Sequence, residues 1–213
     1  MNKKTVAIKL FLFLIMPIFF IGCKKQDSPP LNTVQETETK LQKTIRLANK
    51  GDVESQFYLG RYYATGEGVQ KDRKKAYHWY SKAAQKGQSN AQYNLSLCYF
   101  YGRGVTIDKV KSFEWGLKAA QQQNLDAIFN VAVNYFNGSG VKQDKVKAVE
   151  WYLKAANLGD KQSYYNLGLC YENGEGAQKN LKKALEWYSK SAALGDEDSI
   201  KAVKELNEIL NKK

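Results

Sequence analysis

The amino-acid sequence predicts an all-α fold, a solenoid of stacked helix–turn–helix units. Its four tryptophans recur every 36 residues, and two series of glycines and one of tyrosines keep the same period. A period of about 20 to 50 residues is typical of repeat proteins, in which each unit buries its apolar face by stacking on its neighbours. The residues in register are Trp79, Trp115, Trp151 and Trp187; Gly66, Gly102, Gly138 and Gly174; Gly68, Gly104, Gly140 and Gly176; and Tyr63, Tyr99, Tyr135 and Tyr171.

Composition limits the chemistry that these 213 residues can perform. Hydrophobic residues make up 43% of the chain and charged residues 25%, which argues against a wholly disordered protein. With one histidine and three cysteines, the chain cannot build a multi-histidine metal site, a four-cysteine zinc site or a disulfide-dense scaffold. We therefore expect no metal, no cofactor and no catalytic residues.

The first element, residues 1–22, has the features of a secretory signal peptide. Lysines precede an apolar run from Leu10 to Ile21. That run is too short to span a bilayer as a mature helix, which takes about 20 residues. The Gly22-Cys23 pair resembles the end of a bacterial lipobox, and this resemblance implies cleavage after Gly22 and lipidation of Cys23. Three acyl chains would anchor the protein stably.

A polar tether follows over residues 23–40, and it contains Pro29-Pro30. Lys24 directly after Cys23 implies, by the sorting rule of enteric bacteria, an outer-membrane lipoprotein facing the periplasm. The whole chain carries a net charge of +12. Removal of residues 1–22 takes away three lysines and no acid, which leaves 30 Lys and Arg against 21 Asp and Glu, or +9.

The remainder, residues 41–213, is predicted to be the solenoid, and each unit contains two helices. Helix A covers about 54–65 in the first unit, with Leu59 and Tyr63 on its core side. The Gly-x-Gly turn ends helix A, because glycine reaches positive φ without steric cost. The tryptophans are expected to be core residues on helix B. The residues suited to cap helix B are Asp72, Asp108, Asp144 and Asn180.

Two departures from the period fall in the second unit. Glycine closes helix B at Gly87, Gly159 and Gly195, but the second unit has Gln123 at this position. The other units place a tyrosine directly after the tryptophan, whereas the second unit has Gly116. Loss of an aromatic side chain at Gly116 predicts a local notch or a softer helix.

These residues resemble the Sel-one-like repeat, a variant of the tetratricopeptide helical pair. The third unit shows the pattern through Ala127, Tyr135, Gly138, Gly140, Val141, Asp144, Trp151-Tyr152, Lys154-Ala155-Ala156 and Gly159. The resemblance implies a right-handed α-solenoid with four full repeats and capping helices. The inferred repeats are 52–87, 88–123, 124–159 and 160–195, followed by an end cap over 196–213 and preceded by a degenerate helix over 36–51.

The resemblance also implies a concave groove lined by the side of helix A that faces away from its core residues. We expect a partner protein to bind there. An asparagine ladder offers side-chain amides to an extended peptide, or else stabilises neighbouring repeats. An aliphatic row and tyrosines add contact area. The candidate partner-binding residues are Tyr58, Arg61, Asn94, Leu97, Tyr101, Asn130, Val133, Asn137, Asn166, Leu169 and Asn173.

Motifs that carry chemistry are weak. Ser139 and Lys142 match Ser-x-x-Lys of penicillin-recognising proteins, but they fall on a glycine turn and no Lys-Thr-Gly is present. His78 is interpreted as a surface residue beside Trp79. Cys98 and Cys170 are expected to be free, mostly buried thiols.

The positive charge recurs on helix B and is interspersed with glutamates, which favours a solvated outer face over a nucleic-acid surface. Anionic envelope lipids or an acidic partner remain compatible with it. The lysines that follow the tryptophans are Lys82, Lys118, Lys154 and Lys190.

The sequence thus predicts a monomeric, non-enzymatic protein–protein interaction module, a lipid-anchored scaffold or adaptor that binds a protein and no nucleic acid. One alternative is a periplasmic immunity lipoprotein that neutralises a toxic phospholipase-type effector, as some lipidated relatives do. A surface-exposed lipoprotein that contacts a host is another. A hydrolase acting on cell-wall material or β-lactams is disfavoured.

Overall fold

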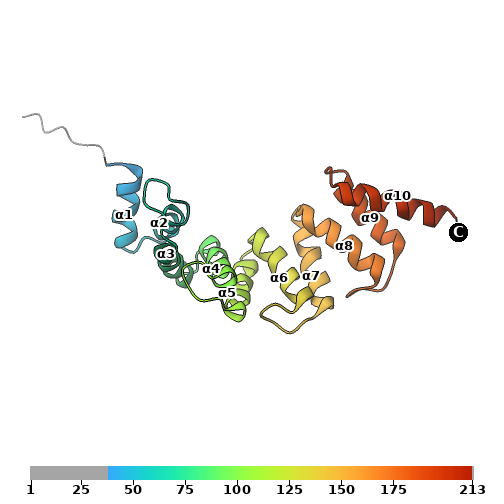
Figure 1. The fold of residues 1–213 in the computed structure, drawn as a ribbon, viewed down its shortest axis with the longest axis horizontal. Coiled ribbons are helices and arrows are strands. Elements are labelled where there is room, and N and C mark those ends of the chain that lie inside the picture. The colour runs from blue at the N-terminus through green and yellow to red at the C-terminus, as the bar shows by residue number, and fades with distance from the viewer. Residues whose placement is uncertain (1–37, 213) are drawn as a thin grey trace, which may run out of the picture. The chain divides into compact units, whose positions relative to one another are not determined.

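The computed structural model describes residues 38–212. The predicted signal peptide, Cys23 and most of the predicted tether lie outside the described residues. Within them the protein consists of ten α-helices and contains no strand, which confirms the all-α prediction (Figure 1). The helices are α1 (Lys40–Asn49), α2 (Val53–Thr65), α3 (Arg73–Gln85), α4 (Ser89–Tyr101), α5 (Lys109–Gln121), α6 (Leu125–Asn137), α7 (Lys145–Asn157), α8 (Lys161–Asn173), α9 (Leu181–Ala192) and α10 (Glu197–Asn211).

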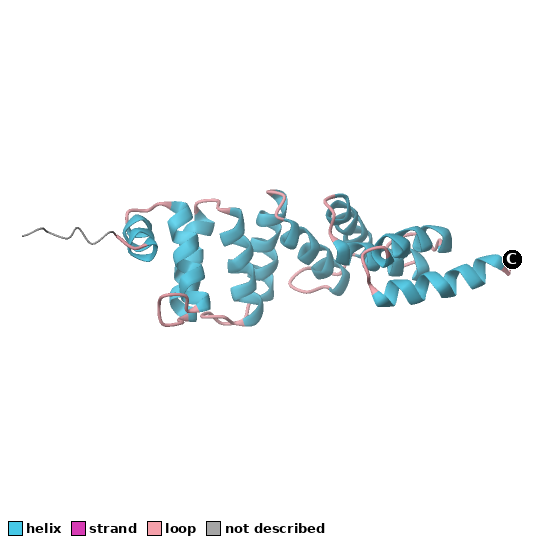
Figure 2. Ribbon diagram, turned by 90° about the horizontal axis from the view of Figure 1, so that it is seen from above, coloured by secondary structure: helices cyan, strands magenta, loops and turns pink. Residues whose placement is uncertain are grey.

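The helices stack in chain order. Among residues 38–212, every extensive helix–helix contact joins consecutive helices, and Figure 2 shows the same succession from above. Helices α2, α4, α6 and α8 are the A helices of four pairs, and α3, α5, α7 and α9 are the B helices. A fold in which each unit touches only its neighbours is an α-solenoid. None of the described helices is long and apolar enough to cross a bilayer.

The predicted helix caps are confirmed. Asp108 accepts a hydrogen bond from the backbone N–H of Lys111 at 2.9 Å, and Asp72, Asp144 and Asn180 cap the other B helices in the same way. This hydrogen bond lowers the pKa of Asp108, since it favours the ionised form. The first glycine of each Gly-x-Gly turn ends helix A with φ between 68° and 87°. Gln123 adopts the same left-handed conformation, at φ 62°, without being glycine.

The second glycine of the turn has a different role, which is close contact with the preceding repeat. A Cβ on Gly140 would overlap the backbone carbonyl of Lys109, at the start of α5, and a Cβ on Gly104 would overlap that of Arg73. Gly176 meets Lys145 in the same way. At the second glycine of the turn, the backbones of adjacent repeats are therefore in direct contact. Only glycine permits this contact, because any other residue would place a Cβ between the two backbones.

The tryptophans differ in part from the prediction. They pack against the core clusters, but each is half-buried rather than enclosed. The ammonium of the lysine three residues later lies 4.0 to 4.7 Å from each ring centroid and covers its outer face. Positions three apart on a helix share a face, and this explains why the two residues recur together.

Candidate partner-binding site

A pocket between α4 and α6 brings together four of the predicted partner-binding residues. Leu97 and Tyr101 come from α4, and Asn130 and Val133 come from α6. Gly116 of α5 also lines it, so we call this cavity, of about 180 Å³, the Gly116 pocket. Its remaining lining residues are Ser96, Phe100, Ser112, Phe129 and Asn134. Tyr101 is 56% exposed, so a large apolar surface stands at the pocket's edge.

The Gly116 pocket exists because one aromatic side chain is missing, as the sequence predicted. In the first and fourth repeats a tyrosine of helix B covers a glycine of helix A so closely that a Cβ on Gly60 would lie 2.6 Å from the Tyr80 ring. Gly168 and Tyr188 make the same contact. In the second repeat the two positions hold Ser96 and Gly116, and no ring fills the space.

The asparagine ladder is used partly inside the protein. Asn130 donates a hydrogen bond to the hydroxyl of Tyr93 in the preceding repeat at 3.4 Å, which fits the alternative that it joins neighbouring repeats. Asn94 and Asn166 each donate to a carbonyl of their own helix at 2.8 Å. A side-chain amide that donates once keeps its oxygen and one N–H for other partners.

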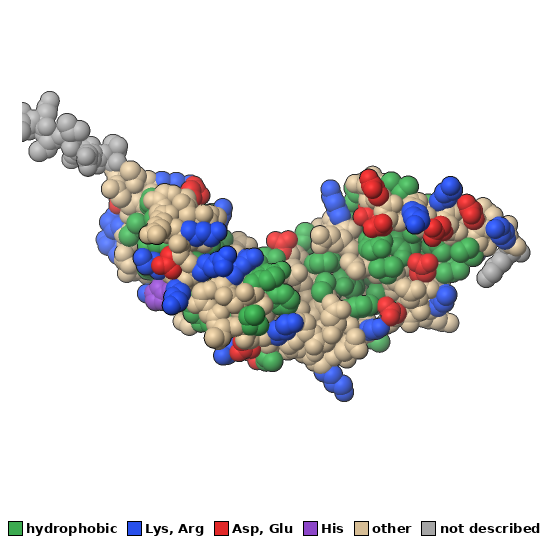
Figure 3. Space-filling model, in the orientation of Figure 1, with side chains coloured by type: hydrophobic (Ala, Val, Ile, Leu, Met, Phe, Trp, Pro, Cys, Tyr) green, Lys and Arg blue, Asp and Glu red, His purple; other side chains and the backbone are tan. Residues whose placement is uncertain are grey.

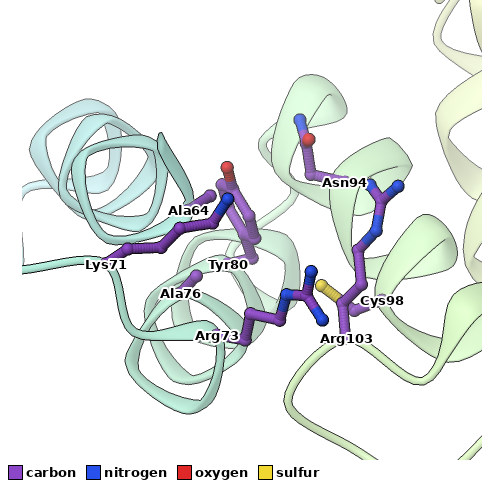
Figure 4. A pocket seen from close by; sticks show the side chains of 8 residues that line it. All are labelled: Ala64, Lys71, Arg73, Ala76, Tyr80, Asn94, Cys98 and Arg103. Atoms are coloured by element: carbon purple, nitrogen blue, oxygen red, sulfur yellow. The ribbon is translucent and has the colours of Figure 1, made fainter. Parts of the chain in front are cut away.

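A second cavity, of about 260 Å³, lies between the first and second repeats, and we call it the basic pocket. Lys71, Arg73 and Arg103 line it (Figure 4). Figure 4 shows that Lys71 comes from the turn after α2, Arg73 from the start of α3 and Arg103 from the turn after α4. The other lining residues are Ala64, Ala76, Tyr80, Asn94 and Cys98. Lys and Arg side chains gather over this part of the surface in Figure 3, whereas acids concentrate over α8–α10.

The two weakly acidic side chains that line the basic pocket, Tyr80 and Cys98, are uncharged at neutral pH. Burial raises the pKa of Tyr80 to about 12, although Arg61 and Arg103 act in the opposite direction. Burial also raises the pKa of the Cys98 thiol to about 11, and that of the Cys170 thiol to about 11. Both cysteines are free and buried, as predicted. Neither is a thiolate at neutral pH, so neither is an activated nucleophile.

The other predicted binding residues are spread along the array. Tyr58 and Arg61 are exposed on α2, and the Arg61 guanidinium lies 5.8 Å from the Tyr58 ring centroid. Asn166 lines a separate cavity of about 380 Å³ at the α8–α9 end. Leu169 is half-buried and packs against the core cluster formed by Ala184 and Tyr188 of α9 and Leu206 of α10. Asn137 and Asn173 are exposed at the last residues of α6 and α8.

The residues considered for catalysis do not assemble. The Ser139 hydroxyl is buried without a hydrogen-bond partner, and Lys142 is exposed and makes no bond to it among residues 38–212. His78 is exposed, and its ring packs edge-on against the ring of Trp79, with 5.3 Å between the two ring centroids. The described part of the chain contains no group of three or more His, Cys, Asp or Glu residues placed to hold a metal ion.

Sequence reasoning missed Lys71, Arg73 and Arg103. The available signal was a comparison of equivalent positions between repeats. Two repeats later, the position of Arg73 holds Lys145 and that of Arg103 holds Glu175. The later pair therefore joins a cation to an acid, whereas the earlier pair consists of two cations. The change from an acid to Arg103 is visible in the sequence, but its meaning depends on knowing that the two positions are close.

Comparison with known proteins places the helical pairs in one repeat class. The family model for the Sel1 repeat matches four segments, residues 53–88, 89–124, 125–160 and 161–196. No curated protein matches the chain. Among solved structures, a protective antigen of uropathogenic Escherichia coli strains that displays an SLR fold is 39% identical, with a TM-score of 0.75 over 76% of this chain and 35% of that one.

A Sel1 repeat protein from Oxalobacter formigenes is 31% identical, with a TM-score of 0.72 over 76% of this chain and 67% of that one. The chain therefore spans about a third of the Escherichia coli antigen and two thirds of the Oxalobacter protein.

Proposed function

The chain belongs to the Sel1 repeat family, and we propose that it is a non-enzymatic adaptor that binds an extended segment of a partner protein at the Gly116 pocket. The supporting observation is that Leu97, Tyr101 and Val133 converge on one concave apolar cavity. An exposed tyrosine beside an apolar pocket is typical of the residues that dominate binding energy at interfaces. The polar rim is supplied by Asn130.

Selection of peptides tests this proposal. Random dodecapeptides displayed on phage are panned against the full chain, and the affinity of each selected peptide is measured by fluorescence anisotropy. We expect Tyr101→Ala to weaken binding about tenfold or more, because an aromatic anchor at an interface is worth about 2 kcal/mol. The midpoint of thermal unfolding should stay unchanged, since Tyr101 is mostly exposed.

Val146→Ala is the matched control, because Val146 is an apolar residue of similar exposure, 58%, at the start of α7. Equal weakening by Tyr101→Ala and Val146→Ala would contradict the proposal. So would a Tyr101→Ala variant that loses stability and binding together.

We also propose that Cys23 carries a lipid that holds this adaptor at the bacterial cell envelope, at the outer membrane facing the periplasm. The apolar run before Cys23 and the small residue Gly22 support this proposal. When the full chain is expressed in a Gram-negative host with a clickable palmitate analogue, the parent chain should be labelled and sediment with membranes. Cys23→Ser should remain unlabelled; a labelled Cys23→Ser chain would contradict lipidation at this residue.

A further inference from the structure

The basic pocket contains an unbalanced cluster of positive charge. The contact of Gly104 with the Arg73 carbonyl brings the start of α3 against the turn that carries Arg103. Both arginines and Lys71 then line one cavity (Figure 4). No Asp or Glu of residues 38–212 lies within 4.0 Å of these three cationic groups.

The same positions two repeats later show what this junction lacks. There Lys145 and Glu175 take the places of Arg73 and Arg103, and their Nζ and Oε1 atoms form an ion pair at 2.7 Å. One junction of the solenoid thus supplies its own carboxylate, while the other has a second cation at the corresponding position.

A second carboxylate is missing in the same way. In the fourth repeat the Tyr188 hydroxyl donates a hydrogen bond to Glu172 Oε2 at 2.7 Å. The corresponding residues of the first repeat are Tyr80 and Ala64, and both line the basic pocket. The first repeat therefore has no acid at the position that accepts this hydrogen bond in the fourth repeat.

Asp72, the acid directly before Arg73 in the chain, is engaged in capping α3. Its carboxylate accepts hydrogen bonds from the backbone N–H groups of Lys74 and Lys75 at 2.9 and 3.0 Å. Grouped cations without a counter-charge repel one another, so an anion that enters the pocket is favoured.

We propose that the basic pocket binds a carboxylate side chain of an acidic polypeptide segment, whose neighbouring apolar residue enters the Gly116 pocket. This rests on the proposed function and adds the chemistry of the partner. Guanidinium groups bind carboxylates through paired N–H donors, which gives direction as well as charge. Asn94 keeps its side-chain oxygen for a peptide N–H, because the bond that it makes in the protein uses its amide nitrogen.

The two pockets are joined by one contact. The Arg103 guanidinium lies 4.5 Å from the ring centroid of Tyr101, which stands at the edge of the Gly116 pocket. A segment that pairs an acid with Arg103 therefore meets the Tyr101 ring next. This juxtaposition of charge and apolar surface distinguishes a polypeptide ligand from a free inorganic anion.

The dodecapeptides selected against the full chain test the inference. We expect Asp and Glu to be enriched beside Leu, Ile, Val or Phe, and binding to weaken as salt rises. Arg103→Glu recreates the charges of the Lys145–Glu175 pair and should lower peptide affinity about tenfold or more. Arg103→Gln should give an intermediate loss, and the thermal unfolding midpoint should not fall in either variant.

Lys182→Glu is the matched control, since it makes the same charge change at an exposed position of α9 and should leave affinity unchanged. Selected peptides without acids that depend on Tyr101 but not on Arg103 would overturn this inference while the proposed function stands. Equal losses in Arg103→Glu and Lys182→Glu would overturn it too. If no peptide is selected, both proposals fail.

Vesicles of phosphatidylglycerol and phosphatidylcholine distinguish the other source of anions, a lipid headgroup. Anionic vesicles that bind the full chain in an Arg103-dependent manner and displace the acidic peptides would overturn the assignment to a polypeptide. Binding of the peptides with no Arg103-dependent binding to vesicles supports it.

Discussion

Gly140→Ala is expected to lower the free energy of unfolding by about 3 to 5 kcal/mol. Two costs combine. Gly140 has φ 72°, which an L-residue adopts only with strain, and its added Cβ would overlap the Lys109 carbonyl. Because that carbonyl belongs to the start of α5, backbone must move for the methyl group to fit.

Gly159→Ala separates the free-energy cost of the positive φ from that of the overlap with the carbonyl. Gly159 has φ 87°, but nothing lies within 4 Å of the Cβ that would be added there. This variant should lose only the conformational part, about 1 to 2 kcal/mol. Urea unfolding followed by circular dichroism at 222 nm measures both. If the two variants lose equal stability, the contact between Gly140 and Lys109 does not constrain the junction.

Ser96→Gly combined with Gly116→Tyr is expected to restore the pairing of the first and fourth repeats and to fill the Gly116 pocket. Burial of an aromatic side chain contributes about 1.5 to 3 kcal/mol, so the double variant should be more stable than the parent chain. Each single change should destabilise. Tyrosine at 116 meets the Ser96 side chain, and glycine at 96 weakens α4 by about 1 kcal/mol.

The double-mutant cycle gives the measurement. The coupling free energy between the two positions should be about 1 to 3 kcal/mol and favourable. The double variant should also lose the peptides selected on the parent chain, because the tyrosine ring occupies the cavity that they need. Additive effects, or peptide binding that survives in the double variant, would contradict this account of the Gly116 pocket.

The sequence predicted the elements of the fold well, because they depend on local signals that recur. The glycines that end helix A and the caps such as Asp108 are visible within one repeat, and the missing ring at Gly116 is visible when one position is compared between repeats. The basic pocket depends instead on which residues of two repeats become neighbours. Arg73 and Arg103 meet because Gly104 lets two backbones touch, and no periodic pattern states that contact. Leu169 shows the same limit, since it packs against a cluster of residues that come from α9 and α10.

Within residues 38–212, extensive contacts join only consecutive helices, and this has a consequence for how the chain can change in evolution. Duplication or deletion of one whole repeat leaves each remaining repeat beside a compatible neighbour, because the same contact between a glycine and a backbone carbonyl joins the repeats at Gly104, Gly140 and Gly176. The length of the array is therefore easily altered, whereas a peptide site that takes residues from three consecutive repeats is not. Insertion of a unit between the second and third repeats would separate Leu97 and Tyr101 from Val133 and break up the Gly116 pocket, even though the fold survived.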